Sequence, residues 1–115
     1  MGKMIDEFNS YRNRMNERIM DTADTNIKRF IALDTTTYAN GALNVKTKEM
    51  LGLVASMVLR CDDCIKYHLG KCYEEGVSTT EMNEIFMIAN LVGGSIVIPH
   101  YRRALEYWEE LNGNL

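Results

Sequence analysis

Residues 48–68 read KEMLGLVASMVLRCDDCIKYH and combine a long apolar run with a pair of thiols. Cys61 and Cys64 form a Cys-x-x-Cys pair, His68 follows Cys64 by one helical turn, and Glu49 precedes the apolar run. The whole chain has only two histidines and three cysteines. An acid, two thiols and an imidazole gathered in one short stretch predict a thiol redox site.

The apolar run LGLVASMVL belongs to a helix that we expect over 45–59. Asn44 is a suitable N-cap, because its side chain can accept a hydrogen bond from a free backbone amide. The run is apolar on nearly every side, which predicts a helix buried all round at the centre of the fold or of an oligomer. Glu49 falls in the second turn of this helix.

A second helix is expected to start near Cys61 and to run to Glu75, with Gly76 as a left-handed C-cap. Positions three and four apart on a helix are neighbours, so Cys61, Cys64 and His68 share one face. The two thiols can form a disulfide, which needs Cα atoms within about 4.4–6.8 Å of each other. The imidazole can take a thiol proton and so produce the thiolate, which is the nucleophile.

Glu49 is placed to be the partner of His68. If the two helices are antiparallel, Glu49 lies about as far before the turn near Arg60 as His68 lies after it. Across such a hairpin a carboxylate can hold an imidazole in one tautomer and stabilise its charged form, as the acid of a catalytic triad does. We therefore predict a Glu49–His68 pair beside the thiols.

The segments on either side of this hairpin also have helical patterning. Apolar residues recur at spacings of three and four over 3–20, and a further helix is expected over about 25–38. Ser78 begins a capping box, Ser-Thr-Thr-Glu, for a helix that Gly93-Gly94 stops. Ser95 is expected to cap the last helix, with a proline in its first turn.

Composition limits the class of protein. A chain of 115 residues without strand-type alternation predicts an all-α bundle of about six helices in one domain over 1–115, with N-terminal helices over 1–40 and the redox core over 44–111. The net charge of −3 gives no reason to expect a nucleic acid or membrane partner. No apolar run reaches the ~18 residues that a membrane span needs. We therefore expect a cytoplasmic protein, where thiols stay reduced unless they cycle.

The motif Glu49-x11-Cys61-x2-Cys64-x3-His68 resembles the signature of the AhpD-like alkylhydroperoxidases, within the wider carboxymuconolactone decarboxylase family. This resemblance implies an AhpD-like helical fold that assembles as a homo-oligomer, a trimer or a hexamer. It also implies an antioxidant peroxidase that reduces small hydroperoxides without a bound cofactor or metal.

The resemblance assigns a role to each residue of the motif. Cys64 would be the peroxidatic thiol, oxidised to a sulfenic acid, and Cys61 would resolve it to a disulfide. His68 and Glu49 would form the proton relay. A dithiol donor, such as a lipoyl-bearing or thioredoxin-like partner, would then reduce the disulfide.

The chain departs from the family pattern at Asp63, where the well-studied peroxidases have a further histidine. Asp62 and Asp63 place two negative charges beside the thiols, which opposes thiolate formation, and Arg60 is expected to compensate. General disulfide exchange is therefore a variant of the redox interpretation. The chain is also shorter than two-repeat members, so we expect it to need oligomerisation to close its site.

Two further interpretations remain open. One is an enzyme like the carboxymuconolactone decarboxylases, although these generally lack the cysteine pair. The other is a zinc-binding or redox-sensing oligomer, in which Cys61, Cys64 and His68 would be ligands and Cys72 would be the fourth. Cys72 is otherwise expected to be a small buried side chain, and His100 a structural or interfacial one.

Overall fold

The computed structural model describes residues 2–113, and the regular secondary structure in that range is helical throughout. This confirms the predicted all-α fold. The elements in chain order are α1 (Lys3–Thr22), α2 (Thr25–Thr37), α3 (Val45–Val58), α4 (Asp62–Glu74), α5 (Thr79–Gly93), the 3-10 helix η1 (Ser95–Val97) and α6 (Ile98–Leu111).

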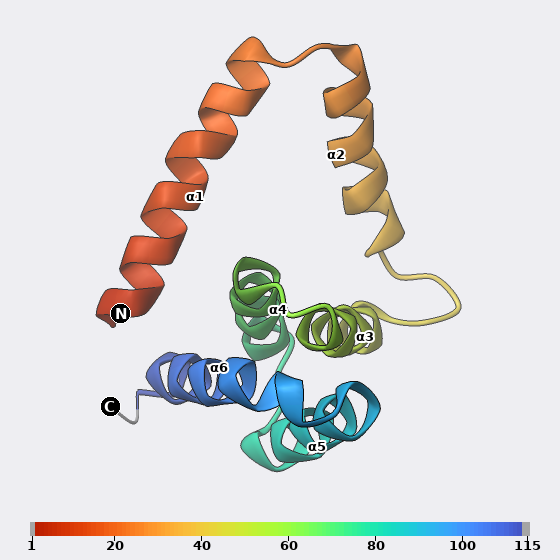
Figure 1. Cartoon of the computed structure of the whole chain (residues 1–115). Helices are drawn as coiled ribbons and strands as arrows, with labels where there is room; N and C mark the ends of the chain where they lie inside the picture. Colours follow the sequence, from red (N-terminus) through yellow and green to blue (C-terminus); the bar gives the residue numbers. More distant parts are fainter. Residues whose placement is uncertain (1, 114–115) are drawn as a thin grey trace.

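Helices α3 to α6 form a packed body, and α1 and α2 rise from it as the two arms of an inverted V (Figure 1). In the body, α4 and α5 pack against α3, and α6 packs against α4. Trp108 is almost completely buried, and its indole N–H donates a 3.1 Å hydrogen bond to the Thr79 hydroxyl. Other fully buried side chains of this core are Leu53, Met57, Leu69, Met82, Ala89 and Val97.

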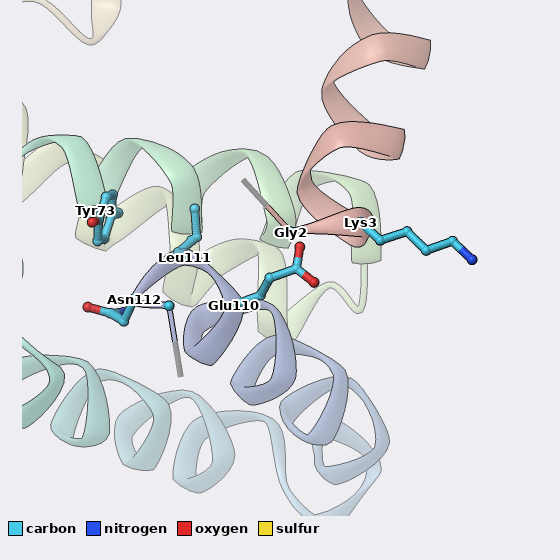
Figure 2. Close-up of a pocket in the computed structure, with 7 residues that line it drawn as sticks. Gly2, Lys3, Tyr73, Glu110, Leu111 and Asn112 are labelled. Carbon is cyan, nitrogen blue, oxygen red and sulfur yellow. The ribbon is translucent and has the colours of Figure 1, made fainter. Parts of the chain in front are cut away.

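Helix α1 is fixed to the body at its start. Ile5 is its buried residue, and Phe8 meets Tyr107 edge-on with 6.1 Å between ring centroids. The Glu110 carboxylate accepts hydrogen bonds from the backbone N–H of Ile5 at 2.7 Å and of Met4 at 3.4 Å. Figure 2 shows this carboxylate directed at the first turn of α1. It satisfies amides that have no partner within the helix and complements the positive end of the helix dipole.

Helix α2 buries no side chain within the single chain. Asp24 caps its start, and the Lys48 ammonium group donates hydrogen bonds to the Thr37 and Ala39 carbonyls at its end, at 2.8 and 2.6 Å. A cation suits this position, because the last carbonyls of a helix are free and carry partial negative charge. The two arms leave exposed the large apolar side chains of Tyr11, Met15, Ile19, Met20, Ile27, Phe30, Ile31 and Leu33.

The turn between α3 and α4 is built on one left-handed residue, Arg60, with φ 61°. The Arg60 N–H donates to the Met57 carbonyl and the Cys61 N–H donates to the Ser56 carbonyl, both at 3.0 Å. These two bonds make a Schellman motif, with an arginine where glycine is usual. Cys61 is then the N-cap of α4, and its sulfur accepts a hydrogen bond from the Cys64 N–H at 3.3 Å.

The predicted ends of the later helices are confirmed with one exception. Gly76 has φ 81° beyond α4, and Ser78 opens α5 with both hydrogen bonds of the capping box. The prediction for Ser95 is wrong, because its side chain makes no capping hydrogen bond. The chain turns at Gly94, with φ 82°, and continues through η1 into α6, where Pro99 lies in the first turn.

Within the single chain α3 is not buried all round, and its predicted burial in an oligomer stays a prediction. Leu53 and Met57 are fully buried, but Leu51 is 56% exposed and Leu59 is 77% exposed. On this side of α3 an open apolar groove of about 550 Å³ runs between α3 and α5. Its lining includes Met50, Leu51, Val54, Val58, Ile85, Ile88 and Val92. None of the described helices is long and apolar enough to cross a membrane.

Candidate active site

Cys61 and Cys64 are joined as a disulfide at the start of α4, with their Cα atoms 5.3 Å apart. Cys64 is exposed and Cys61 is partly buried. Both residues lie at the positive end of the α4 dipole, which favours the thiolate form when the pair is reduced. The structure thus brings the two predicted thiols together and gives them unequal access to solvent.

Glu49 and His68 meet across the α3–α4 hairpin. The distance between His68 Nδ1 and Glu49 Oε1 is 2.7 Å, and the residues are 8% and 3% exposed. A carboxylate only accepts hydrogen bonds, so Nδ1 carries the proton and donates it, while Nε2 remains available for other partners. The contact that the hairpin argument predicts is present, and the catalytic role of the two residues remains a prediction.

Cys64 and His68 line one pocket of about 360 Å³. Helix α1 supplies one wall of this pocket and α4 supplies another, with a contribution from α2. The exposed Cys64 and the His68 imidazole therefore border the same space. The other lining residues are Phe8, Tyr11, Arg12, Met15, Asn16, Asp34, Asp63 and Tyr67.

Two tyrosines pack beside His68, and neither was predicted from the sequence as part of the site. The rings of Tyr38 and Tyr67 lie 5.4 and 5.2 Å from the imidazole, between centroids. Burial, and then the nearby Glu49 carboxylate, raise the pKa of Tyr38, so its hydroxyl keeps its proton at neutral pH. The Arg12 guanidinium lies 4.2 Å from the centre of the Tyr67 ring, in a cation–π contact. Tyr67 could have been found as the neighbour of His68, but no spacing rule links Tyr38 to it.

Gly52 is a second feature that sequence reasoning missed. A Cβ atom built on it would lie 2.6 Å from the Tyr38 hydroxyl oxygen and 2.7 Å from His68 Cε1, closer than real Cβ contacts. Glycine inside a helix costs about 1 kcal/mol relative to alanine. Here it allows the His68 ring and the Tyr38 hydroxyl to approach the α3 backbone. An isolated glycine within the helical run of α3 was the available signal.

His100 belongs to a cluster that joins α6 to the start of α4. Its Nδ1 lies 2.8 Å from Asp62 Oδ1, and Arg103 Nε donates to Asp62 Oδ2 at 3.1 Å. These two residues of α6 pair with Asp62, and the expected compensation by Arg60 stays a prediction. Asp63, the next residue, is exposed and lines the same pocket as Cys64.

Cys72 is fully buried, as expected for a small apolar side chain. Burial, together with the Glu49 charge, raises the pKa of its thiol to about 12, so it stays protonated at neutral pH. Over residues 2–113, no group of three or more His, Cys, Asp or Glu side chains is arranged to hold a metal ion. Cys72 therefore does not complete a set of zinc ligands with Cys61, Cys64 and His68 in this structure.

Sequence comparison identifies relatives over most of the chain. The pattern that defines the carboxymuconolactone decarboxylase family matches residues 26–109. A curated relative, "Uncharacterized protein 4 in cox locus" of Paracoccus denitrificans, is 27% identical over 84 residues, which cover 73% of this chain and 76% of that protein.

Structural comparison identifies the same family. Two crystal structures of one Thermotoga maritima protein match with TM-scores of 0.91 and 0.87, at 53% and 52% identity. The first match covers 94% of this chain and 95% of that one, and the second covers 95% and 97%. That protein is described as a carboxymuconolactone decarboxylase family protein with a suggested part in an antioxidative response. A family protein from Legionella pneumophila shares the fold at 21% identity, with a TM-score of 0.87 over 96% of this chain and 98% of that one.

We expect Gly52→Ala to displace His68 or Tyr38 and to destabilise the protein by about 1–3 kcal/mol, as overpacking does. The matched control is Gly70→Ala in α4, where a built Cβ meets no atom within 4 Å. The control should gain up to about 1 kcal/mol from the helix preference of alanine. Urea unfolding measures both changes, and NMR of the His68 ring reports its displacement. Equal stabilisation of both variants would contradict the close approach at Gly52.

Proposed function

This chain belongs to the carboxymuconolactone decarboxylase family, and on that basis we propose that it is a thiol-dependent peroxidase that reduces small hydroperoxides through Cys64 and Cys61. The observation that carries the proposal is that the exposed Cys64 and His68 line the same pocket, while the buried Glu49 carboxylate is hydrogen-bonded to His68 Nδ1. The Thermotoga maritima relative has a suggested role in an antioxidative response, which supports the same chemistry.

The proposed reaction begins with the Cys64 thiolate at the start of α4. It attacks the terminal oxygen of the hydroperoxide, the O–O bond breaks, and the alkoxide takes a proton and leaves as an alcohol. Cys64 is then a sulfenic acid. The Cys61 thiol attacks that sulfur, the S–O bond breaks and water leaves, which forms the disulfide. The hydroperoxide has gained two electrons and the cysteine pair has lost two.

We assign the proton transfers to His68 and Glu49. The buried carboxylate accepts the Nδ1 hydrogen and stabilises the imidazolium, so that Nε2 can take the Cys64 proton and later give it to the leaving oxygen. The short contact and low exposure of the pair support this assignment, because a hydrogen bond of this kind restricts the ring to one orientation.

A dithiol donor must close the cycle. Its thiolate attacks the Cys61–Cys64 bond, forms a mixed disulfide and then leaves in oxidised form, which returns both cysteines to thiols. The exposure of Cys64 supports direct exchange with a lipoyl-bearing or thioredoxin-like donor. General disulfide exchange with such donors is the variant of this function in which peroxide turnover is slow.

We further propose that the working form is a homo-oligomer, a trimer or a hexamer. The apolar arms and the α3–α5 groove supply unpartnered surfaces on one chain. Exposed apolar surface of this extent is typical of interfaces. Copies of the chain that cover α1 would also stabilise the wall of the Cys64 pocket, to which α1 contributes.

Cys64→Ser should abolish peroxide consumption in an assay coupled to a dithiol, because serine cannot form the sulfenic acid. Cys61→Ser should still react once and accumulate sulfenic acid at Cys64, which mass spectrometry locates. Cys72→Ala should stay active, since that thiol is buried and protonated. Wild-type turnover in Cys64→Ser would reject the proposal. A decarboxylase activity that survives full alkylation of the cysteines would favour the alternative function.

Glu49→Gln should lower kcat/KM for peroxide by about 10²-fold, the low end of the contribution of general acid–base catalysis. The amide removes the charge that stabilises a protonated His68. Glu84→Gln, at an exposed glutamate of α5, is the control for loss of one negative charge. Stopped-flow measurement of the first oxidation separates this step from reduction by the dithiol. An unchanged rate in Glu49→Gln would remove Glu49 from the relay.

Phe30→Glu should shift the assembly toward smaller species, because it places a charge on an apolar side chain that is 70% exposed on α2. Lys28→Glu changes the charge of the same helix at an exposed polar position and should leave assembly unchanged. Sedimentation equilibrium over a range of concentrations gives the masses. A wild-type protein that stays monomeric at high concentration would reject the oligomer.

A further inference from the structure

We propose that Asp62, His100 and Arg103 form a positioning cluster that holds the turn between α3 and α4 against α6. Because Cys61 ends this turn, the cluster sets the equilibrium between the Cys61–Cys64 disulfide and the dithiol. The inference rests on the proposed redox function of that pair. It adds a role for residues outside the thiols and the Glu49–His68 pair.

The geometry of the cluster uses both oxygens of one carboxylate. Asp62 Oδ1 is 2.8 Å from His100 Nδ1, and Asp62 Oδ2 accepts from Arg103 Nε at 3.1 Å. The side chain of His100 is 18% exposed, that of Asp62 38% and that of Arg103 52%. The imidazole is thus the least exposed member, and its Nδ1 contacts both the Asp62 carboxylate at 2.8 Å and the Arg103 Nη2 at 3.3 Å.

The position of Asp62 in the chain explains how the cluster acts on Cys61. Asp62 is the first residue of α4 and directly follows Cys61, the N-cap. The backbone bonds of the turn connect it to α3 and α4, whereas the Asp62 carboxylate connects it to a third helix, α6. The tie therefore restricts the movement of Cys61 relative to the rest of the body.

This restriction matters most in the reduced state. When the S–S bond is absent, the separation of the two sulfurs depends on how firmly the turn is held. A turn that stays close to the 5.3 Å Cα separation keeps the thiols at a high effective concentration, which favours the disulfide. Without the hydrogen bonds of Asp62 to α6, the reduced turn samples more conformations. Formation of the S–S bond then costs more conformational entropy, and the disulfide is less stable.

The cluster also compensates charge beside the thiols. An unpaired Asp62 carboxylate would oppose the thiolates that disulfide exchange requires. His100 and Arg103 both contact that carboxylate from α6, and Arg103 brings a positive charge to it. An experiment must separate the restraint of the turn from the effect of a negative charge near the thiols. Asp63 provides the control, because it is the next residue in the chain and is exposed.

The test is an equilibrium with dithiothreitol, in which the protein disulfide and the reduced reagent exchange two electrons and two protons. Asp62→Ala should lower the stability of the disulfide about tenfold, equivalent to about 30 mV for a two-electron couple. Asp63→Ala removes a charge beside the same thiols without breaking the tie, and should shift the equilibrium by much less. Asp62→Asn, which keeps an oxygen for His100, should restore most of the wild-type value.

The outcomes separate this inference from the proposed function. If the wild type forms a reversible Cys61–Cys64 disulfide but the Asp62 and Asp63 alanine variants shift it equally or not at all, the positioning cluster is rejected and the redox site stands. If the wild type shows no reversible disulfide, both proposals fail. His100→Gln tests the tie from the α6 side, and provides the measurement if Asp62→Ala does not fold. Its disulfide should also be less stable than that of the wild type, and an unchanged value would count against the cluster.

Discussion

The left-handed turn at Arg60 is the constraint on which the site depends. Reversal of the chain within so few residues places α4 back along α3, which sets Glu49 opposite His68. The same turn makes Cys61 both the last residue of the motif that closes α3 and the N-cap of α4. A non-glycine residue in this region costs about 1–2 kcal/mol. The two backbone hydrogen bonds of the Schellman motif, and the packing of α3 on α4, offset that cost.

Several local rules of stability are broken close together around the thiols. An arginine takes the left-handed position, a glycine lies in the middle of α3, and Glu49 is buried in the protein body. Each exception has a partner in space: the Schellman bonds for Arg60, the aromatic rings for Gly52 and the imidazole for Glu49. Conflicts of this kind are expected at functional sites, because elsewhere selection favours the locally stable choice. Their concentration is independent of the cysteine motif and points to the same region.

The features that could be predicted from the sequence are those that depend on residues close together in the chain. Asn44 and Ser78 cap helices with their own side chains, Gly76 needs a positive φ, and the Cys-x-x-Cys spacing is set by one turn of helix. The contact of Glu49 with His68 was predictable too, because the short turn near Arg60 fixes the register of two neighbouring helices. These inferences hold because the decisive interactions lie within a few residues or across one short turn.

The features that were missed depend on packing between distant segments. Asp62 and His100 are separated by 38 positions, and Tyr38 reaches His68 from the end of α2. No periodicity relates such positions, so only the arrangement of helices reveals them. The exposed side of α3 is a different case, because its burial was predicted for the fold or for an oligomer. Its apolar pattern correctly indicates a surface that avoids water, but the segments described in a single chain do not cover it.

The unequal surroundings of the two sulfurs explain why their roles should differ under the proposed function. A thiol that attacks a hydroperoxide needs an open approach and a base that borders the same space, and Cys64 has both in the pocket with His68. A resolving thiol needs only to reach the oxidised sulfur one helical turn away. Cys61 is partly buried, and the hydrogen bonds of the turn hold it in place. Exchange of the two roles would put the attacking thiol on the less exposed residue, which is why the proposed function assigns the first oxidation to Cys64.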